Sequence, residues 1–138
     1  MVGTPIFKLN SMAIFDHGGN CLFVKEPFKK YFSYEYVLCI LCTKLNTYIL
    51  KNFINNTVNT QIDDIKKIPI PLCKSKEKKK IEELVNNIIN EQKKDLTYSY
   101  HMKEQCEIES IVYEIFGLND ELISEVELWY QRKYPHLK

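Results

Sequence analysis

The sequence predicts an α+β fold, in which a short antiparallel sheet packs against one helix and a helical C-terminal tail follows. Short apolar runs around a glycine turn come first, a longer apolar stretch of helical length comes next, and two amphipathic stripes with a helical period come last. The chain has 138 residues, of which 45% are hydrophobic and 27% charged. This length and composition are typical of a globular domain with a core of its own.

The predicted sheet lies within the first 26 residues. Apolar runs at positions 6–9, 13–15 and 21–24 indicate strands. The last two runs are separated by a turn that contains Gly18 and Gly19, residues that adopt positive φ without steric cost. We therefore expect these two runs to form a hairpin.

One helix is expected to follow the sheet. Ser33 is a favourable N-cap residue, and the helix is expected to end near Phe53. Residues 36–42 are apolar nearly all round, which indicates that this part is buried on most sides. The polar residues 55–61 then predict a loop or an edge strand, and residues 62–67 predict a single helical turn.

The two prolines at positions 69 and 71 mark the start of the helical tail. Each proline fixes its own φ and restricts the residue before it, so Ile68-Pro69-Ile70-Pro71 predicts an extended connection. We place a boundary here, between residues 1–71 and residues 72–138.

Three helices are expected beyond the boundary. Ser75 is a favourable cap for the first, Gly117 is a favourable residue just past the end of the second, and Asn119 is a favourable cap for a last helix that ends near Lys133. Two amphipathic stripes define the first two helices: Ile81, Leu84, Val85, Ile88 and Ile89, then Ile108, Ile111, Val112, Ile115 and Phe116.

Charge is distributed unevenly along the chain. Residues 1–80 hold 13 Lys or Arg and 6 Asp or Glu, whereas residues 81–138 hold 6 and 12, so the formal net charge of +1 hides a basic half and an acidic half. This asymmetry favours a first half that faces a polyanion and a second half that faces protein or water.

The five cysteines are odd in number and form no disulfide framework, and the first residues lead into no long apolar run. The longest apolar stretch, residues 36–42, is far shorter than the roughly 20 residues of a membrane span. We therefore expect a cytoplasmic location with reduced thiols, and no membrane partner.

Three passages occur in an order typical of one protein family. Residues 36–45 (YVLCILCTKL) resemble a "YLLAILNSKL" helix, with Cys42-Thr43 where Asn-Ser is usual. Residues 62–71 resemble an "I…DLKKIPIP" passage, and residues 108–121 resemble an "IDRIVYELYGLTEEE" ending. Together they resemble the C-terminal target-recognition (TaqI-like specificity) domain of adenine-N6 DNA methyltransferases and type IIG restriction–modification enzymes.

The resemblance implies sequence-specific recognition of double-stranded DNA as the C-terminal part of a type II or IIG restriction–modification enzyme or of an adenine-specific DNA methyltransferase. Residues 1–71 would be a partial DNA target-recognition domain, and residues 72–138 a helical region packed on the methyltransferase or endonuclease part of the same enzyme. This sequence contains neither a glycine-rich cofactor loop after a strand nor an Asp/Asn-Pro-Pro-Tyr/Phe tetrapeptide. We therefore expect no catalysis and no cofactor in this chain.

A reader of duplex DNA needs cations for phosphates and short amide or hydroxyl side chains for base edges. Asn and Gln pair with adenine through two hydrogen bonds, and residues 55–61 are rich in such side chains. The candidate DNA-binding residues are Lys8, Asn10, Ser11, Lys44, Lys51, Asn55, Asn56, Thr57, Asn59, Thr60 and Gln61.

Other interpretations of the same residues stay open. A polar loop in an Asn-rich chain can be only a loop, and the lysine-rich run at 74–80 can be a solvated helix start or a contact to the DNA backbone. His17, Cys21, Cys39 and Cys42 equal in number the ligands of a structural zinc site, but core thiols are the simpler interpretation. The alternative function is a non-enzymatic helical protein-interaction module that uses the two stripes.

Overall fold

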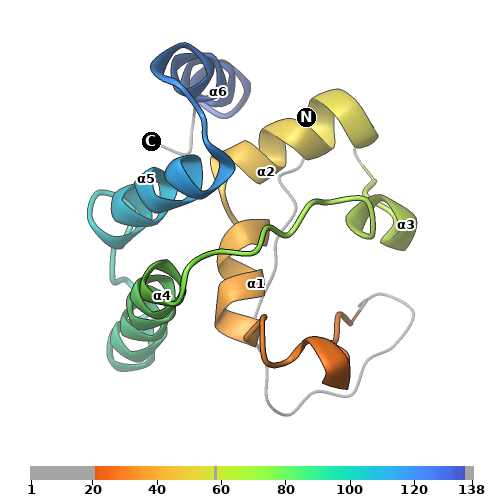
Figure 1. Ribbon diagram of the computed structural model, residues 1–138. Coiled ribbons are helices and arrows are strands. Elements are labelled where there is room, and N and C mark those ends of the chain that lie inside the picture. Colours follow the sequence, from red (N-terminus) through yellow and green to blue (C-terminus); the bar gives the residue numbers. More distant parts are fainter. Residues whose placement is uncertain (1–20, 58, 136–138) are drawn as a thin grey trace.

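The computed structural model describes residues 21–57 and 59–135, and its architecture is shown in Figure 1. Within these residues the chain forms helices and no strand, so the expected α+β fold with an antiparallel sheet is wrong and the described fold is all-α. The runs at 6–9 and 13–15 lie outside the described residues. The third run, 21–24, is not a strand, because no described segment pairs with its backbone.

The predicted helix after Ser33 is two helices. After a short 3₁₀ turn, η1 (Glu26–Phe28), the chain forms α1 (Tyr34–Leu41), α2 (Lys44–Ile49) and the π-helical η2 (Leu50–Ile54). Ser33 caps α1 as expected, since its side chain accepts a hydrogen bond from the N–H of Tyr36. The expectation of one continuous helix to Phe53 is corrected by a bend of 57° between α1 and Lys44–Ile54.

Thr43 explains this break. Its backbone is extended (φ −78°, ψ 156°), so it is the N-cap of α2, and its side chain accepts a hydrogen bond from the Asn46 N–H at 3.2 Å. The Thr43 hydroxyl also donates to the Ile40 carbonyl at 2.9 Å, and Asn46 Nδ2 donates to the Leu41 carbonyl at 3.1 Å. Buried polar side chains thus satisfy backbone groups that a continuous helix would have satisfied itself.

No single helix in the part of the chain that the structure describes is long and apolar enough to cross a membrane. Only when α1 and Lys44–Ile54 are counted together, across the bend between them, do their length and apolar composition reach those of a membrane span.

Where the sequence predicts a start or an end for the remaining helices, the structure agrees to within one or two residues. These helices are α3 (Ile62–Ile65), α4 (Ser75–Lys94), α5 (Glu104–Phe116) and α6 (Asp120–Lys133). Lys74, not Ser75, is the N-cap residue of α4, but Gly117 ends α5 in the left-handed conformation (φ 67°). Asn119 caps α6, because its side chain accepts a hydrogen bond from the Leu122 N–H at 3.0 Å.

Both predicted stripes contribute to one hydrophobic core. Ile40 of α1, Ile81 of α4 and Val112 of α5 are fully buried together, and Val126 of α6 joins the same cluster. The helices α1 and α4 pack against each other, as do α4 and α5, and α2 packs against α6. The core therefore includes residues from both sides of position 71.

The segment that joins α3 to α4, residues 66–74, is called the connecting segment below. Figure 1 shows it crossing α1 as an extended stretch. Ile68 is buried in a second cluster with Val37, Leu41 and Leu50, and the Tyr36 hydroxyl donates to the Pro71 carbonyl at 3.0 Å. These contacts hold the extended connection that the prolines predict against the central helices.

Candidate nucleic-acid interface

Of the eleven residues predicted to contact DNA, Lys8, Asn10 and Ser11 lie outside the described residues. The other eight belong to two groups. Lys44 and Lys51 lie on the helical segment α2–η2, and the remaining six lie on the loop that follows it. The structure brings Lys51 and this loop together, whereas Lys44 has its contacts elsewhere.

Lys44 joins α2 to α6. Its Nζ lies 2.7 Å from Glu127 Oε2 and 5.8 Å from the centre of the Tyr130 ring, and the Lys44 and Glu127 side chains are each 30% exposed. The Lys44 ammonium group thus forms a contact between two helices. It could bind a phosphate only if its ion pair with Glu127 were broken.

Lys51 supports the polar loop from inside. The residue is only 4% exposed, and its Nζ donates a hydrogen bond to the Thr57 carbonyl at 2.8 Å. Burial lowers the pKa of Lys51, because the charged form loses hydration, while the nearby Asp64 acts in the opposite direction. Its ammonium group therefore stabilises the loop and is not available at the surface.

Asn55 and Asp64 close the loop, and we call this pair the Asn55–Asp64 clip. Asn55 Nδ2 donates to Asp64 Oδ2 at 2.5 Å and to the Asn59 carbonyl at 3.1 Å. Asn55 Oδ1 accepts from the backbone N–H and from the hydroxyl of Thr57, at 2.8 and 2.6 Å. Asp64 Oδ2 also accepts the Gln61 N–H at 2.9 Å, and these hydrogen bonds lower the pKa of the Asp64 carboxyl.

The remaining loop side chains face outward or are only partly covered. Asn56, Asn59 and Gln61 are exposed, and the side chains of Asn56 and Asn59 form no hydrogen bond to another described residue. Thr57 is exposed as well, although its hydroxyl is engaged by Asn55, and Thr60 is half-buried. The clip thus divides the predicted site into residues that build the loop and residues that it presents to solvent.

Two lysines that were not predicted as contacts lie beside this loop. Lys66 and Lys67 follow α3 directly, and their side chains are 70% and 62% exposed. Lys66 Nζ lies 2.8 Å from Asp63 Oδ1, and Lys67 Nζ lies 3.9 Å from Asp64 Oδ1. The Lys66–Asp63 ion pair is exposed on both sides and therefore weak, whereas Lys67 is exposed but its partner Asp64 is buried. The ammonium group of Lys66 in particular is available to a phosphate. The only feature of the sequence that could have indicated these two lysines as contacts is their place in the "DLKKIPIP"-like passage.

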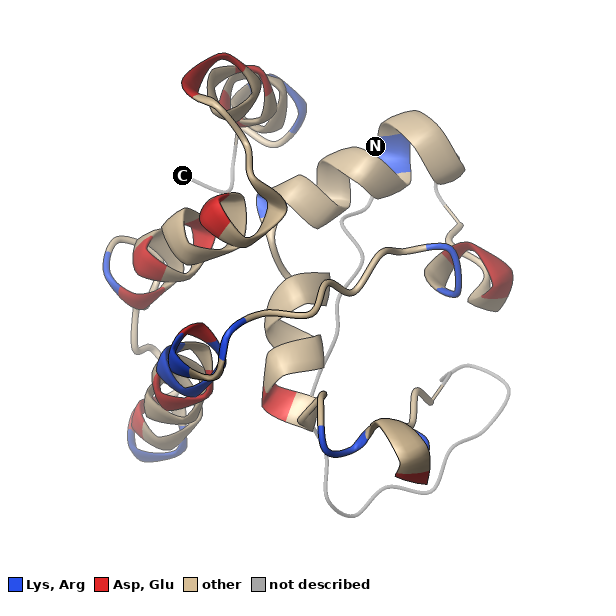
Figure 2. Ribbon diagram, in the orientation of Figure 1, with Lys and Arg blue, Asp and Glu red and all other residues tan. Residues whose placement is uncertain are grey.

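The lysine-rich run at 74–80 is partly used within the chain. Lys80 Nζ lies 2.9 Å from Glu107 Oε1 of α5, and Lys78 Nζ lies 3.8 Å from Glu82 Oε1. Lys76 and Lys79 are exposed. Figure 2 shows basic residues (blue) at both ends of the connecting segment and acidic residues (red) on α5 and α6.

The possible zinc ligands within the described residues, Cys21, Cys39 and Cys42, do not form a metal site. Cys39 is buried in α1, where burial raises the pKa of its thiol, whereas Cys42 is exposed and His17 lies outside the described residues. In residues 21–57 and 59–135, no group of three or more His, Cys, Asp or Glu side chains could hold a metal ion.

A buried carboxylate occupies the break between α1 and α2. Glu109 of α5 is 4% exposed, and it accepts hydrogen bonds from the Lys44 N–H at 3.0 and 3.2 Å and from Gln105 Nε2 at 2.8 Å. Burial raises the pKa of Glu109 to about 7. The carboxylate joins α5 to the start of α2, and no local pattern could reveal it because Lys44 is 65 residues away in the sequence.

The site is thus a closed polar loop, with exposed amides on its surface and exposed lysines beside it. It contains side chains of the kinds that proteins use to contact phosphates and base edges, and the described residues include no group of three or more possible metal ligands. Comparison with known proteins gives no relative: no family model, no curated protein and no solved structure matches the chain.

Proposed function

We propose that this chain recognises a DNA target sequence as the C-terminal part of a type II or IIG restriction–modification enzyme or of an adenine-specific DNA methyltransferase, with the catalytic steps performed by another part of that enzyme. The observation that carries the proposal is the closed loop at residues 55–64 with exposed amide side chains and two exposed lysines directly after it. The ordered resemblance of three passages to such enzymes supports it further.

The chemistry of each group fits duplex DNA. Lys66 and Lys67 offer exposed ammonium groups for phosphates. Displacing the exposed Asp63 from Lys66 costs little, and Lys67 lies 3.9 Å from the buried Asp64 carboxylate. Asn56, Asn59 and Gln61 offer amides of the kind that bind base edges in the major groove. The acidic helices α5 and α6 would repel the duplex, so they would face away from it.

This assignment changes the roles of two predicted contacts. Lys44 and Lys51 support the site from within, because each already holds an internal partner. In this proposal Lys66 and Lys67 replace them as the phosphate contacts next to the loop.

A pair of charge reversals tests the proposal. The full chain, and the chain joined to the coding sequence upstream of it, are titrated with a fluorescent random 30-base-pair duplex at several salt concentrations. K66E/K67E is expected to weaken binding at least about tenfold and to reduce the slope of log affinity against log salt by about 2, since each phosphate contact contributes about 0.9.

The matched control is K93E/K94E at the end of α4, where Lys94 also pairs with a carboxylate three residues earlier at 2.6 Å. This variant has the same change in net charge, and is expected to bind like the wild type. Equal losses in both variants would reduce the effect to net charge, and the absence of wild-type binding at low salt would contradict the proposal.

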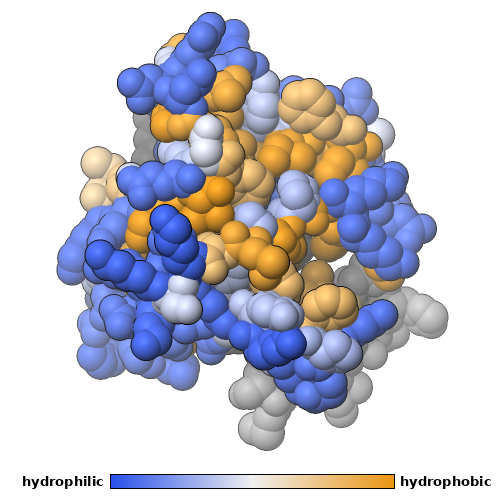
Figure 3. All heavy atoms as spheres, in the orientation of Figure 1, coloured by the Kyte–Doolittle hydropathy of each residue, from blue (hydrophilic) through white to orange (hydrophobic). Residues whose placement is uncertain are grey.

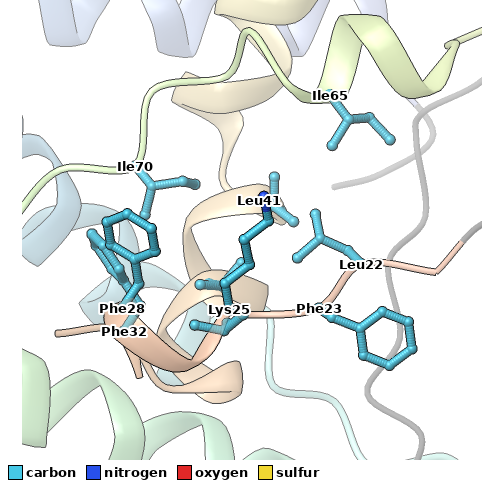
Figure 4. Close-up of a pocket in the computed structure, with 10 residues that line it drawn as sticks. Leu22, Phe23, Lys25, Phe28, Phe32, Leu41, Ile65 and Ile70 are labelled. Atoms are coloured by element: carbon cyan, nitrogen blue, oxygen red, sulfur yellow. The ribbon is translucent and has the colours of Figure 1, made fainter. Parts of the chain in front are cut away.

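A protein-interaction module is the second candidate, and an apolar groove favours it. Figure 4 shows side chains of Leu22, Phe28 and Phe32, together with Ile65 and Ile70, around this hollow of about 360 Å³. Hydrophobic side chains also cover the middle of the face seen in Figure 3. Half of the residues of the two helical stripes are buried in the core, and the other half are partly buried against it, so most of their surface is already covered. DNA-independent self-association in sedimentation experiments would support this candidate.

A further inference from the structure

We infer that the Asn55–Asp64 clip is the specificity-determining device of the loop: it fixes the backbone so that Asn56, Asn59 and Gln61 read A·T base pairs in the major groove. This inference rests on the proposed function and adds two things to it, the kind of base pair that is read and a residue, Asn55, that acts by position and not by contact.

The clip uses every hydrogen-bonding group of the Asn55 side chain. Its amide nitrogen donates twice, to Asp64 and to the Asn59 carbonyl, and its oxygen accepts twice, both times from Thr57. A half-buried amide with all its groups satisfied inside one loop is a structural element of that loop. Asn55 therefore does not itself read a base.

The segments on both sides of the loop are anchored in the core. Leu50 of η2 is fully buried, and Ile68 beyond α3 is 6% exposed in the same hydrophobic cluster. The buried Lys51 Nζ donates a hydrogen bond to the Thr57 carbonyl, which links the loop to the helix that precedes it. A loop fixed at its ends and at its centre loses little further conformational freedom when it binds.

The exposed side chains then decide which bases are read. Asn and Gln are the side chains that pair through two hydrogen bonds with adenine N6 and N7, and one such pair contributes about a tenfold preference or more. In this inference phosphates are contacted by Lys66 and Lys67, and Lys66 pairs with Asp63, which is outside the clip, so its contribution to affinity is separable from specificity. Lys67 also lies 3.9 Å from Asp64 of the clip. Loosening the clip is expected to remove base preference and leave phosphate-driven binding.

The test selects bound sequences from a random 30-base-pair duplex pool with the full chain, joined to its upstream coding sequence where that is needed for binding. Wild type is expected to enrich A·T pairs at two or more positions. N55A is expected to lower that enrichment about tenfold while the salt dependence of binding stays unchanged. The control is N52A, an exposed asparagine whose amide donates to the Tyr48 carbonyl outside the loop.

T57A provides a second variant in case N55A does not fold, because it removes only the hydroxyl of an exposed residue, which donates to Asn55 of the clip. It is expected to lower enrichment in the same direction, by a smaller factor. Circular dichroism reports whether each variant keeps its helices.

The outcomes separate the two claims. Wild-type enrichment that survives unchanged in folded N55A or T57A overturns the role of the clip and leaves the proposed function intact. Enrichment of G·C pairs in place of A·T pairs overturns the assignment to adenine. The absence of any duplex binding by wild type at low salt overturns the proposed function, and this inference with it.

Discussion

The charged side chains of this molecule are of two kinds. Some are buried and hold segments of the fold together, and others face the solvent. Lys51 and Glu109 are each 4% exposed, and each is held by backbone groups of another segment. Lys66 and Lys67 are chemically similar to Lys51 but are largely exposed. The position of an ammonium group relative to the core, and not its residue type, decides whether it can meet a phosphate.

Glu109 makes stability depend on pH. Its pKa of about 7 lies above the ordinary value of 4.5, so the folded chain holds this proton more tightly than the unfolded chain does. Stability is therefore expected to fall as pH rises through the window from about 4.5 to 7, by up to about 3 kcal/mol, and to change no further because of this group above about pH 8.

E109Q is expected to remove this fall, because the amide stays neutral and still offers an oxygen to the Lys44 N–H. Urea unfolding at pH 5, 6, 7 and 8 measures it, with E114Q as a control at an exposed position of the same helix. A wild-type profile and an E109Q profile of the same shape would contradict the role of Glu109.

Helix ends decide the shape of each element. Gly117 and Asn119 behave as their residue types predict, because a left-handed C-terminal glycine and an N-terminal amide cap act on neighbouring backbone. Thr43 acts in the same local way, yet it lies in an apolar stretch that favours an unbroken helix. A single buried hydroxyl therefore divides α1 from α2 and sets the direction of the segment that leads to the loop.

Thr43 is expected to be worth about 1 to 2 kcal/mol. T43A removes the acceptor for the Asn46 N–H and the donor to the Ile40 carbonyl, and a lost N-cap of this type costs about that much. T43S keeps the hydroxyl and is expected to lose clearly less. Chemical unfolding of the three proteins measures the difference, and equal stability of T43A and wild type would contradict the capping role.

The whole molecule is held by one core to which both halves of the chain contribute. Ile40 lies before the connecting segment, and Ile81 and Val112 lie after it, yet all three are fully buried in one cluster. At the other end of the fold, Tyr48 of α2 and Trp129 of α6 lie edge to face, with ring centres 5.3 Å apart. The basic half and the acidic half are thus packed on each other.

Ile40 tests this shared core. I40A is expected to lower the free energy of unfolding by about 2 to 5 kcal/mol, because the fully buried side chain leaves a cavity. Trp129 fluorescence and helical circular dichroism are expected to report one coincident transition in wild type and variant. Two separate transitions would show that residues 1–71 and 72–138 unfold independently.

Local sequence patterns predict most of the helices in residues 72–138. The stripe from Ile81 to Ile89 predicts α4 because residues three and four apart meet on one helix face, and this holds wherever the helix packs. A local pattern cannot decide in the same way whether a sheet forms. A short apolar run such as 21–24 forms a strand only if another segment pairs with its backbone, and no described segment does.

By itself, the sequence determined the caps at Ser33 and Asn119, the helix end at Gly117, the helix periods, the extended connection at Pro69 and Pro71, and the presence of a polar loop at 55–61. These depend on residues close together along the chain. Only the tertiary structure decided that Lys44 and Lys51 turn inward, that Lys66 and Lys67 stay exposed, and that Asn55 closes the loop with Asp64. Burial and hydrogen-bond partners depend on how distant segments pack, and neither composition nor spacing specifies that packing.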